Sequence, residues 1–166
     1  MKRILLQLAA YRKWANRQII DTLNTVPEEV LSRDMNDSFG GIRNTLFHLL
    51  LSEHIWWDRI RLQENINPPS NSLKNDFAKL TREILKFSDA WMELIEEASE
   101  NRLQHVFEYR NSKKEAFKQP LYEVLLHILN HQTYHYGQII TMLREQGIDK
   151  LPATDFIKFS RSVKRP

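Results

Sequence analysis

The chain has 166 residues, a length typical of one domain with its own hydrophobic core. Hydrophobic residues make up 42% and charged residues 27%, a balance that excludes a disordered or low-complexity chain. The formal net charge is only +3, which does not indicate a nucleic-acid-binding protein, and the absence of cysteine excludes disulfides, thiolate-ligated zinc and a cysteine nucleophile. We therefore expect a single domain over residues 1–166, in which any metal site uses His, Asp or Glu.

The amino-terminal segment imitates a signal peptide. Lys2 and Arg3 precede the apolar residues 4–10, but this stretch is short, contains Gln7 and continues directly into basic residues. We interpret it as the start of a helix. The aliphatic run 49–51 is far shorter than the ~20 residues of a membrane span. The sequence thus predicts a cytoplasmic protein with no membrane partner.

Two long helices are predicted in the first part of the chain. Over residues 3–24, apolar side chains recur three or four positions apart, as on one face of an α-helix. After Gly40 and Gly41, a second helix is apolar nearly all round its middle, which indicates burial on several sides. The predicted core positions of the first helix are Ile4, Leu8, Tyr11, Ala15, Ile19 and Leu23.

Two further helices are predicted in the second part. Ser72 is the predicted cap of a third helix, whose apolar positions alternate steps of four and three from Leu73 to Ala98. Residues 101–119 break this pattern and predict a short hairpin or an irregular loop. A fourth helix is predicted from Pro120, as its first residue, to Gly147, and the 148–166 tail is predicted to pack back on the bundle. The fold class is therefore all-α, an antiparallel four-helix bundle with a short irregular or hairpin insertion before the last helix.

Histidine spacing is the strongest chemical signal. His127, His131 and His135 stand four residues apart on the fourth helix, so neighbouring pairs share one face, about 6 Å apart. Because His127 and His135 are separated by ~12 Å along the axis, all three cannot bind one ion. The third ligand must come from a facing helix, and His48 is the best candidate because it lies in a strongly apolar segment. Ordinary core or surface histidines are the alternative, and the zincin pattern is absent because Gln132 follows His131.

Four pieces of sequence follow one another in order along almost the whole chain: the Tyr11-x-x-Trp14-Ala15-Asn16 segment, His48 with Trp56, the His131-x-x-x-His135-x-Gly137-Gln138 segment, and the Leu151-to-Phe156 tail. Together they resemble the DinB/YfiT-like family of metal-binding four-helix bundles. The resemblance implies that His48, His131 and His135 bind the metal and that His127 lies outside the ligand set. One departure is Tyr136, where the family often has Arg directly after its last metal histidine.

Three neutral imidazoles leave a divalent metal coordinatively open, which is typical of a catalytic site, and imidazole suits zinc, nickel or iron. The family resemblance implies a metal-dependent hydrolase or a transferase using a low-molecular-weight thiol, acting on a small molecule that the sequence does not identify. Glu53 is a candidate general base or a solvated helix residue. Tyr134 and Gln138 are candidates to orient the imidazoles, or ordinary packing and surface residues.

The alternatives are a metal- or ligand-binding bundle without turnover, acting as a stress-related accessory protein, and a structural helical protein with incidental histidines. The basic tail of Lys158, Arg161, Lys164 and Arg165 is interpreted as a solvated end, so we expect no nucleic-acid partner. The apolar stripes of the first and third helices predict a homodimer, as the family resemblance also implies.

Overall fold

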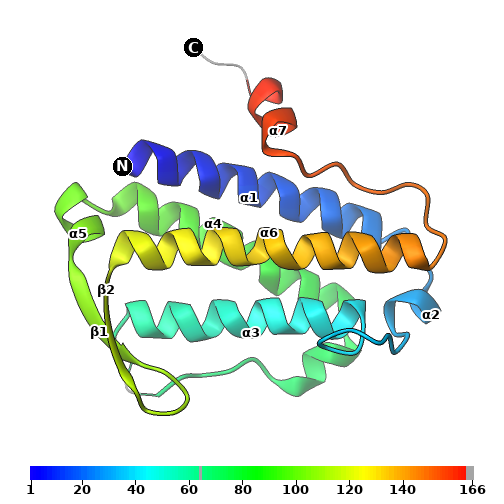
Figure 1. Ribbon diagram of the computed structural model, residues 1–166, viewed down its shortest axis with the longest axis horizontal. Coiled ribbons are helices and arrows are strands. Elements are labelled where there is room, and N and C mark those ends of the chain that lie inside the picture. Colours follow the sequence, from blue (N-terminus) through cyan, green and yellow to red (C-terminus); the bar gives the residue numbers. More distant parts are fainter. Residues whose placement is uncertain (64, 164–166) are drawn as a thin grey trace.

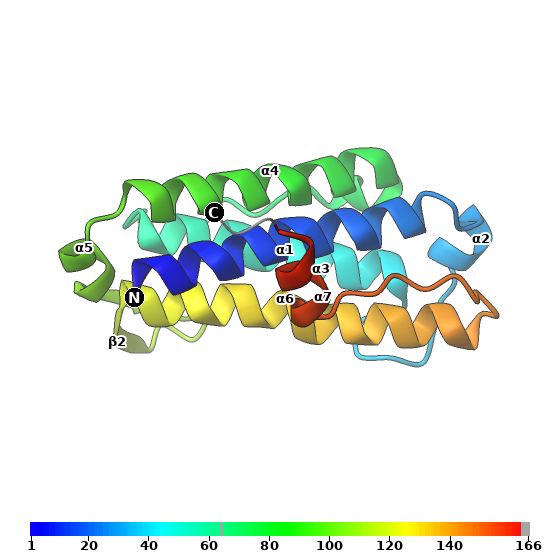
Figure 2. The ribbon, with the colours of Figure 1, turned by 90° about the horizontal axis from the view of Figure 1, so that it is seen from above.

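Four long helices form the body of the computed structural model, which describes residues 1–63 and 65–163. They are α1 (Lys2–Leu23), α3 (Ile42–Ile60), α4 (Phe77–Glu97) and α6 (Leu121–Glu145). In Figures 1 and 2, α1 and α3 occupy opposite corners of the bundle, and α4 and α6 each lie between them. The predicted all-α helical bundle is confirmed.

The direction of the helices follows from one long connection. Figure 1 shows α1 and α6 running one way and α3 and α4 the other, because the segment after α3 returns along the whole bundle before α4 begins. The contacts of α1 with α4 and of α3 with α6 are therefore antiparallel, whereas α1 and α6 lie parallel.

The start of α4 differs from the prediction. Ser72 lies inside a short 3-10 helix, η1 (Asn71–Asn75), which Ser70 caps. The cap of α4 is Asp76, whose carboxylate accepts a hydrogen bond from the Lys79 amide at 2.9 Å. The predicted cap at Ser72 is wrong because the chain makes one tight 3-10 turn before the α-helix, and a carboxylate also complements the positive end of the helix dipole.

The segment before α6 contains a short helix, α5 (Glu100–Gln104), and a hairpin of β1 (Val106–Arg110) and β2 (Ala116–Pro120). The strands are antiparallel with Tyr109 opposite Phe117, and these rings stack at 5.8 Å. Of the two predicted alternatives, the hairpin is present. Pro120 is not the first helical residue: it ends β2 in an extended conformation and precedes α6 as its N-cap.

The core has two apolar clusters. One surrounds Leu46 and Ile139, and the other surrounds Leu5 and Leu103. The four long helices also bury a set of hydrogen-bonded side chains, which we call the polar layer; two of its members, Tyr136 and Trp91, also pack in these clusters. Its members are Arg12, Asn16, Glu53, Ser88, Trp91, Gln132 and Tyr136.

The predicted stripe of α1 is correct only in its second half. Ile4 is 63% exposed, and the first half instead buries Leu5, Ala9 and Arg12. The apolar pattern misleads here because Arg12 enters the polar layer, while Tyr11 lies on the side covered by the tail. Its hydroxyl donates to the Thr154 carbonyl at 2.6 Å.

The remaining helices are short: α2 (Glu28–Leu31) follows α1, and α7 (Phe156–Ser162) packs on α1 through the buried Phe159. The tail therefore returns to the bundle, as Figure 2 shows. Among the described residues, no helix combines the length and apolar character that crossing a bilayer requires.

Candidate metal centre

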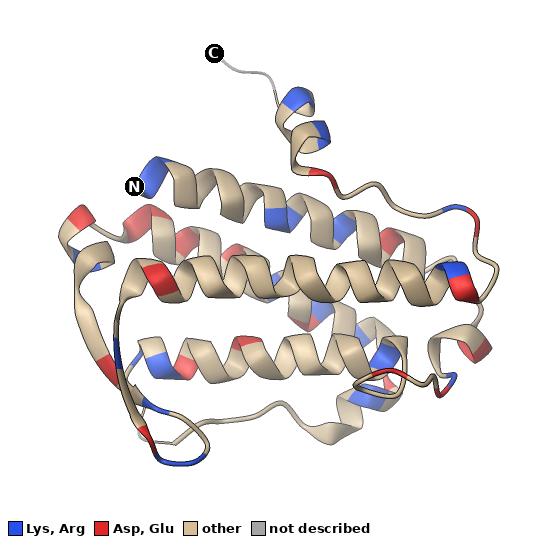
Figure 3. Cartoon of the chain, viewed as in Figure 1, with Lys and Arg blue, Asp and Glu red and all other residues tan. Residues whose placement is uncertain are grey.

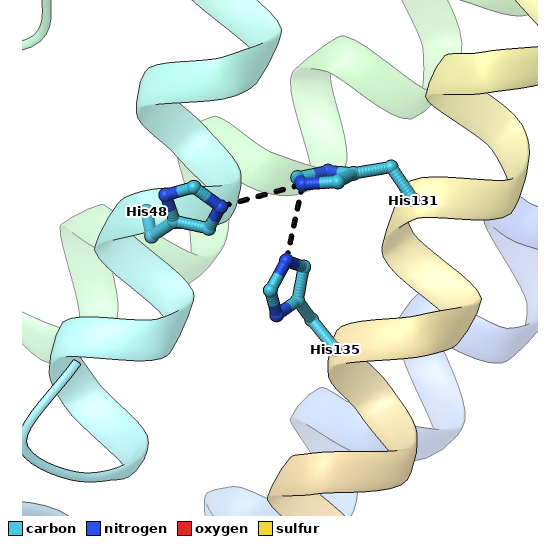
Figure 4. A group of neighbouring side chains, drawn as sticks. All are labelled: His48, His131 and His135. Carbon is cyan, nitrogen blue, oxygen red and sulfur yellow. Dashed lines mark hydrogen bonds between the residues drawn. The ribbon is translucent and has the colours of Figure 1, made fainter. Parts of the chain in front are cut away.

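Three histidine side chains meet between α3 and α6 (Figure 4). His48 points from α3 toward His131 and His135, which lie one turn apart on α6. Nε2 of His131 is 3.3 Å from Nε2 of His48 and 3.0 Å from Nε2 of His135. One ligand atom from each residue lies within 4.8 Å of the others.

The two separations from His131, 3.3 and 3.0 Å, match those between ligands of one metal ion. At metal–nitrogen distances of ~2.1 Å, two imidazole nitrogens lie about 3.4 Å apart in a tetrahedral site and about 3.0 Å apart at neighbouring octahedral positions. A donor set of three imidazoles also matches zinc and related divalent metals. The residues present therefore fit such an ion.

The orientation of His135 is fixed by Gln138. Nδ1 of His135 lies 2.6 Å from Oε1 of Gln138, which in this amide orientation can only accept, so Nδ1 carries the proton. In the neutral ring Nε2 is then the unprotonated nitrogen, and it faces the other histidines. The prediction that Gln138 orients an imidazole is thus matched by a direct contact. Tyr134, 65% exposed, contacts the His135 ring edge-on at 5.0 Å.

No sequence pattern indicated Phe39, which lies in the loop before α3. Its ring stacks on His48 at 4.1 Å and meets His135 edge-on at 5.4 Å. The loop is held by Asp37, which accepts hydrogen bonds from the amides of Phe39 and Gly41. Gly41 is required there because its φ is +115° and an added Cβ would lie 2.3 Å from the Arg33 carbonyl oxygen.

Electrostatics favours the metal-binding form of these rings. Burial, together with the neighbouring histidines and Arg12, lowers the pKa of His131 to about 4. Burial and His135 also lower the pKa of His48. Both rings are therefore neutral at neutral pH, as metal ligation requires.

The fourth-helix histidine outside this group is His127. It contacts the rings of Trp56 at 5.2 Å and His131 at 5.5 Å. His54 instead meets Phe87 at 4.9 Å. The pair that faces His48 is therefore His131 and His135.

Glu53, the candidate base, is 4% exposed and belongs to the polar layer. One carboxylate oxygen accepts from Nη2 of Arg12 and the other from Nε1 of Trp91, both at 2.5 Å. It is not a solvated helix residue, and both of its oxygens accept from residues other than the histidines. Tyr136, at the position of the family arginine, is also in the polar layer and not among the metal-ligand candidates.

The fold and the site together define a helical-bundle protein with a three-histidine group able to hold a divalent metal. The model of the DinB family matches residues 1–164, and the chain belongs to this family. This chain is 26% identical to Protein DinB of Bacillus subtilis (strain 168) over 165 residues. The aligned region covers 94% of this chain and 93% of that protein. The family resemblance predicted from the sequence is confirmed.

Proposed function

We propose that this protein is a divalent-metal-dependent enzyme, a hydrolase or a low-molecular-weight-thiol transferase acting on a small molecule. The observation that carries the proposal is the convergence of Nε2 of His48, His131 and His135 from two facing helices. Three protein ligands leave positions for water or substrate, the pattern of catalytic rather than structural sites.

A bound divalent metal would supply a Lewis acid that polarises a substrate oxygen or lowers the pKa of a water or thiol. The protein's own part is to bind and orient. The three histidines would hold the ion in their neutral form. Gln138 keeps His135 in the required tautomer, and Phe39 places an apolar ring against His48 and His135, which limits water on that side.

One observation favours a second candidate, a metal- or small-ligand-binding bundle without turnover, acting as a stress-related accessory protein. The candidate general base, Glu53, accepts hydrogen bonds through both carboxylate oxygens, from Arg12 and Trp91. A carboxylate engaged in this way is less suited to proton transfer, which favours binding without turnover.

Metal analysis separates these proposals. Protein purified without chelators, or reconstituted with zinc, nickel or iron, is analysed by plasma mass spectrometry beside His131→Ala. About one equivalent in the wild type, lost in the variant, supports the site; no metal in either overturns it. The loaded protein is then assayed with ester, amide and thiol-transfer substrates, and turnover that disappears in His131→Ala supports the enzyme over the binding protein.

For partners, we propose a homodimer and no nucleic acid. Apolar side chains exposed on α1 and in the tail, Ile4 and Ile157, support self-association. Figure 3 shows both charge signs interspersed along the helices and loops. Of the basic tail, Lys158 and Arg161 lie on α7, while Lys164 and Arg165 lie outside the described residues. Light scattering that reports only monomer, or a salt-dependent shift with DNA, would contradict these proposals.

A further inference from the structure

The polar layer is a continuous buried chain of hydrogen bonds that joins all four long helices. From α4, Ser88 accepts from Asn16 at 2.6 Å; Tyr136 donates to Asn16 at 2.9 Å and accepts from Gln132 at 2.7 Å. Gln132 accepts from Arg12, whose other contact is the ion pair with Glu53. Each of the seven members, Trp91 included, is at most 4% exposed.

Two members of the polar layer are neighbours in sequence of the metal-ligand candidates. Gln132 directly follows His131, and Tyr136 directly follows His135. Successive helical residues point about 100° apart, so α6 presents its histidine pair to α3 and its Gln132–Tyr136 pair to α1. A rotation of α6 that moved the histidines away from His48 would also break the contacts of Gln132 and Tyr136 with α1.

Directional hydrogen bonds and ion pairs restrict the rotation of a helix about its axis more than apolar packing does. Leu and Ile side chains tolerate small rotations, whereas the buried Arg12 charge and the Tyr136 hydroxyl each need a partner at one position. Burial raises the pKa of Tyr136, which keeps its hydroxyl protonated and able to donate to Asn16. The best-attested role of buried polar groups is to fix such a register.

We propose that Gln132 and Tyr136, held by Arg12 and Asn16 of α1, are positioning residues that fix the rotation of α6 and thereby hold His131 and His135 opposite His48. This inference rests on the proposed metal site. It assigns a role to Tyr136, a residue at which the chain departs from the family pattern.

The test compares variants that remove a polar contact but keep the volume, Gln132→Met and Tyr136→Phe, with a core variant outside the layer, Leu143→Ala on the same helix. Leu143 is fully buried in the apolar cluster around Ile139. For each protein we would measure the unfolding midpoint in urea, the zinc dissociation constant by chelator competition and the absorption spectrum with cobalt(II).

We expect both layer variants to bind zinc about 10- to 100-fold more weakly and to change the cobalt(II) spectrum, as outer partners of metal ligands do. Leu143→Ala should lose at least as much stability yet keep the wild-type spectrum and affinity. If all three variants lose affinity in proportion to stability, or if the layer variants bind as wild type, the proposal is overturned.

A second readout needs no metal. The rings of His48 and His131 lie 5.2 Å apart between centroids, so nuclear Overhauser contacts between their protons report the rotation of α6 in the metal-free protein. We expect Gln132→Met and Tyr136→Phe to weaken these contacts and Leu143→Ala to keep them. A wild type that binds no metal would overturn the proposed function alone, and these contacts would still decide whether the layer positions the histidines.

Discussion

Nδ1 of His135 donates a hydrogen bond to Oε1 of Gln138 at 2.6 Å, less than one helical turn further along α6. This contact leaves Nε2 of the same ring as the unprotonated nitrogen, 3.0 Å from Nε2 of His131. The tautomer that a metal requires is therefore set by Gln138, a residue outside the histidine group.

Gln138→Leu should accordingly weaken metal binding. Without the acceptor, the ring can adopt the other tautomer, and we expect the zinc dissociation constant to rise about 10- to 100-fold. Gln138→Glu keeps an acceptor and should retain most of the affinity. A chelator competition titration checks both, and equal affinities for Leu and Glu would contradict the role of Gln138.

Removing individual histidines should show which α6 pair binds the metal, His127 with His131 or His131 with His135. His135→Ala is expected to abolish stoichiometric metal, while His127→Ala should keep about one equivalent, because His127 meets the Trp56 ring edge-on and lies outside the group. Plasma mass spectrometry after gel filtration measures this directly. Metal that survives His135→Ala but not His127→Ala would show that the ion uses the other pair.

The metal-free protein should lose stability in mild acid. Folding lowers the pKa of His131 from 6.5 to about 4, so below pH 6.5 the unfolded chain takes up a proton that the folded chain resists. The full stability is present above pH 6.5 and part of it is lost as the pH falls toward 4.

Urea unfolding at pH 7 and pH 5, after chelator treatment, measures this loss. His131→Asn removes the titrating group and should show a smaller fall between the two pH values. An equal fall in the wild type and the variant would mean that His131 is not the group responsible. The lowered pKa of His48 acts in the same direction, so the variant should retain part of the effect.

Gly41 tests the loop that carries Phe39, and Gly137 inside α6 is the control. Gly41→Ala would place a methyl group against the Arg33 carbonyl at a φ of +115°, and should cost about 1–3 kcal/mol of unfolding free energy or more. Gly137→Ala meets nothing within 4 Å inside α6 and should stabilise by about 0.5–1 kcal/mol. Urea unfolding checks both, and a wild-type midpoint for Gly41→Ala would contradict the strained turn.

The bundle and the histidine spacing were predictable because both depend on local periodicity. A 3.6-residue repeat identifies a helix, and a four-residue step places His131 and His135 on one face whatever surrounds them. The strongly apolar segment around His48 indicated the third ligand, and the family resemblance then selected the pair of His131 and His135 over the pair that includes His127.

The polar layer was not predictable in the same way. Arg12 occupies a core position of α1, but its partners Glu53 and Gln132 are 41 and 120 residues away. No local pattern signals such a contact, and an arginine on a helix is ordinarily exposed. Phe39 was missed for a related reason, since a loop residue has no periodicity to mark its direction.

Phe39 nevertheless leads to the last prediction, because its ring covers one side of the histidine group. Stacked on His48 at 4.1 Å, it restricts both the motion of that ring and the access of water. Phe39→Ala should therefore release zinc to an excess of chelator about tenfold faster than the wild type does. Phe39→Leu keeps an apolar side chain, so its release rate should lie between those of the wild type and Phe39→Ala. The release is followed by absorbance of a chromophoric chelator. If alanine and wild type release zinc at the same rate, the opening used by solvent lies on another side of the site.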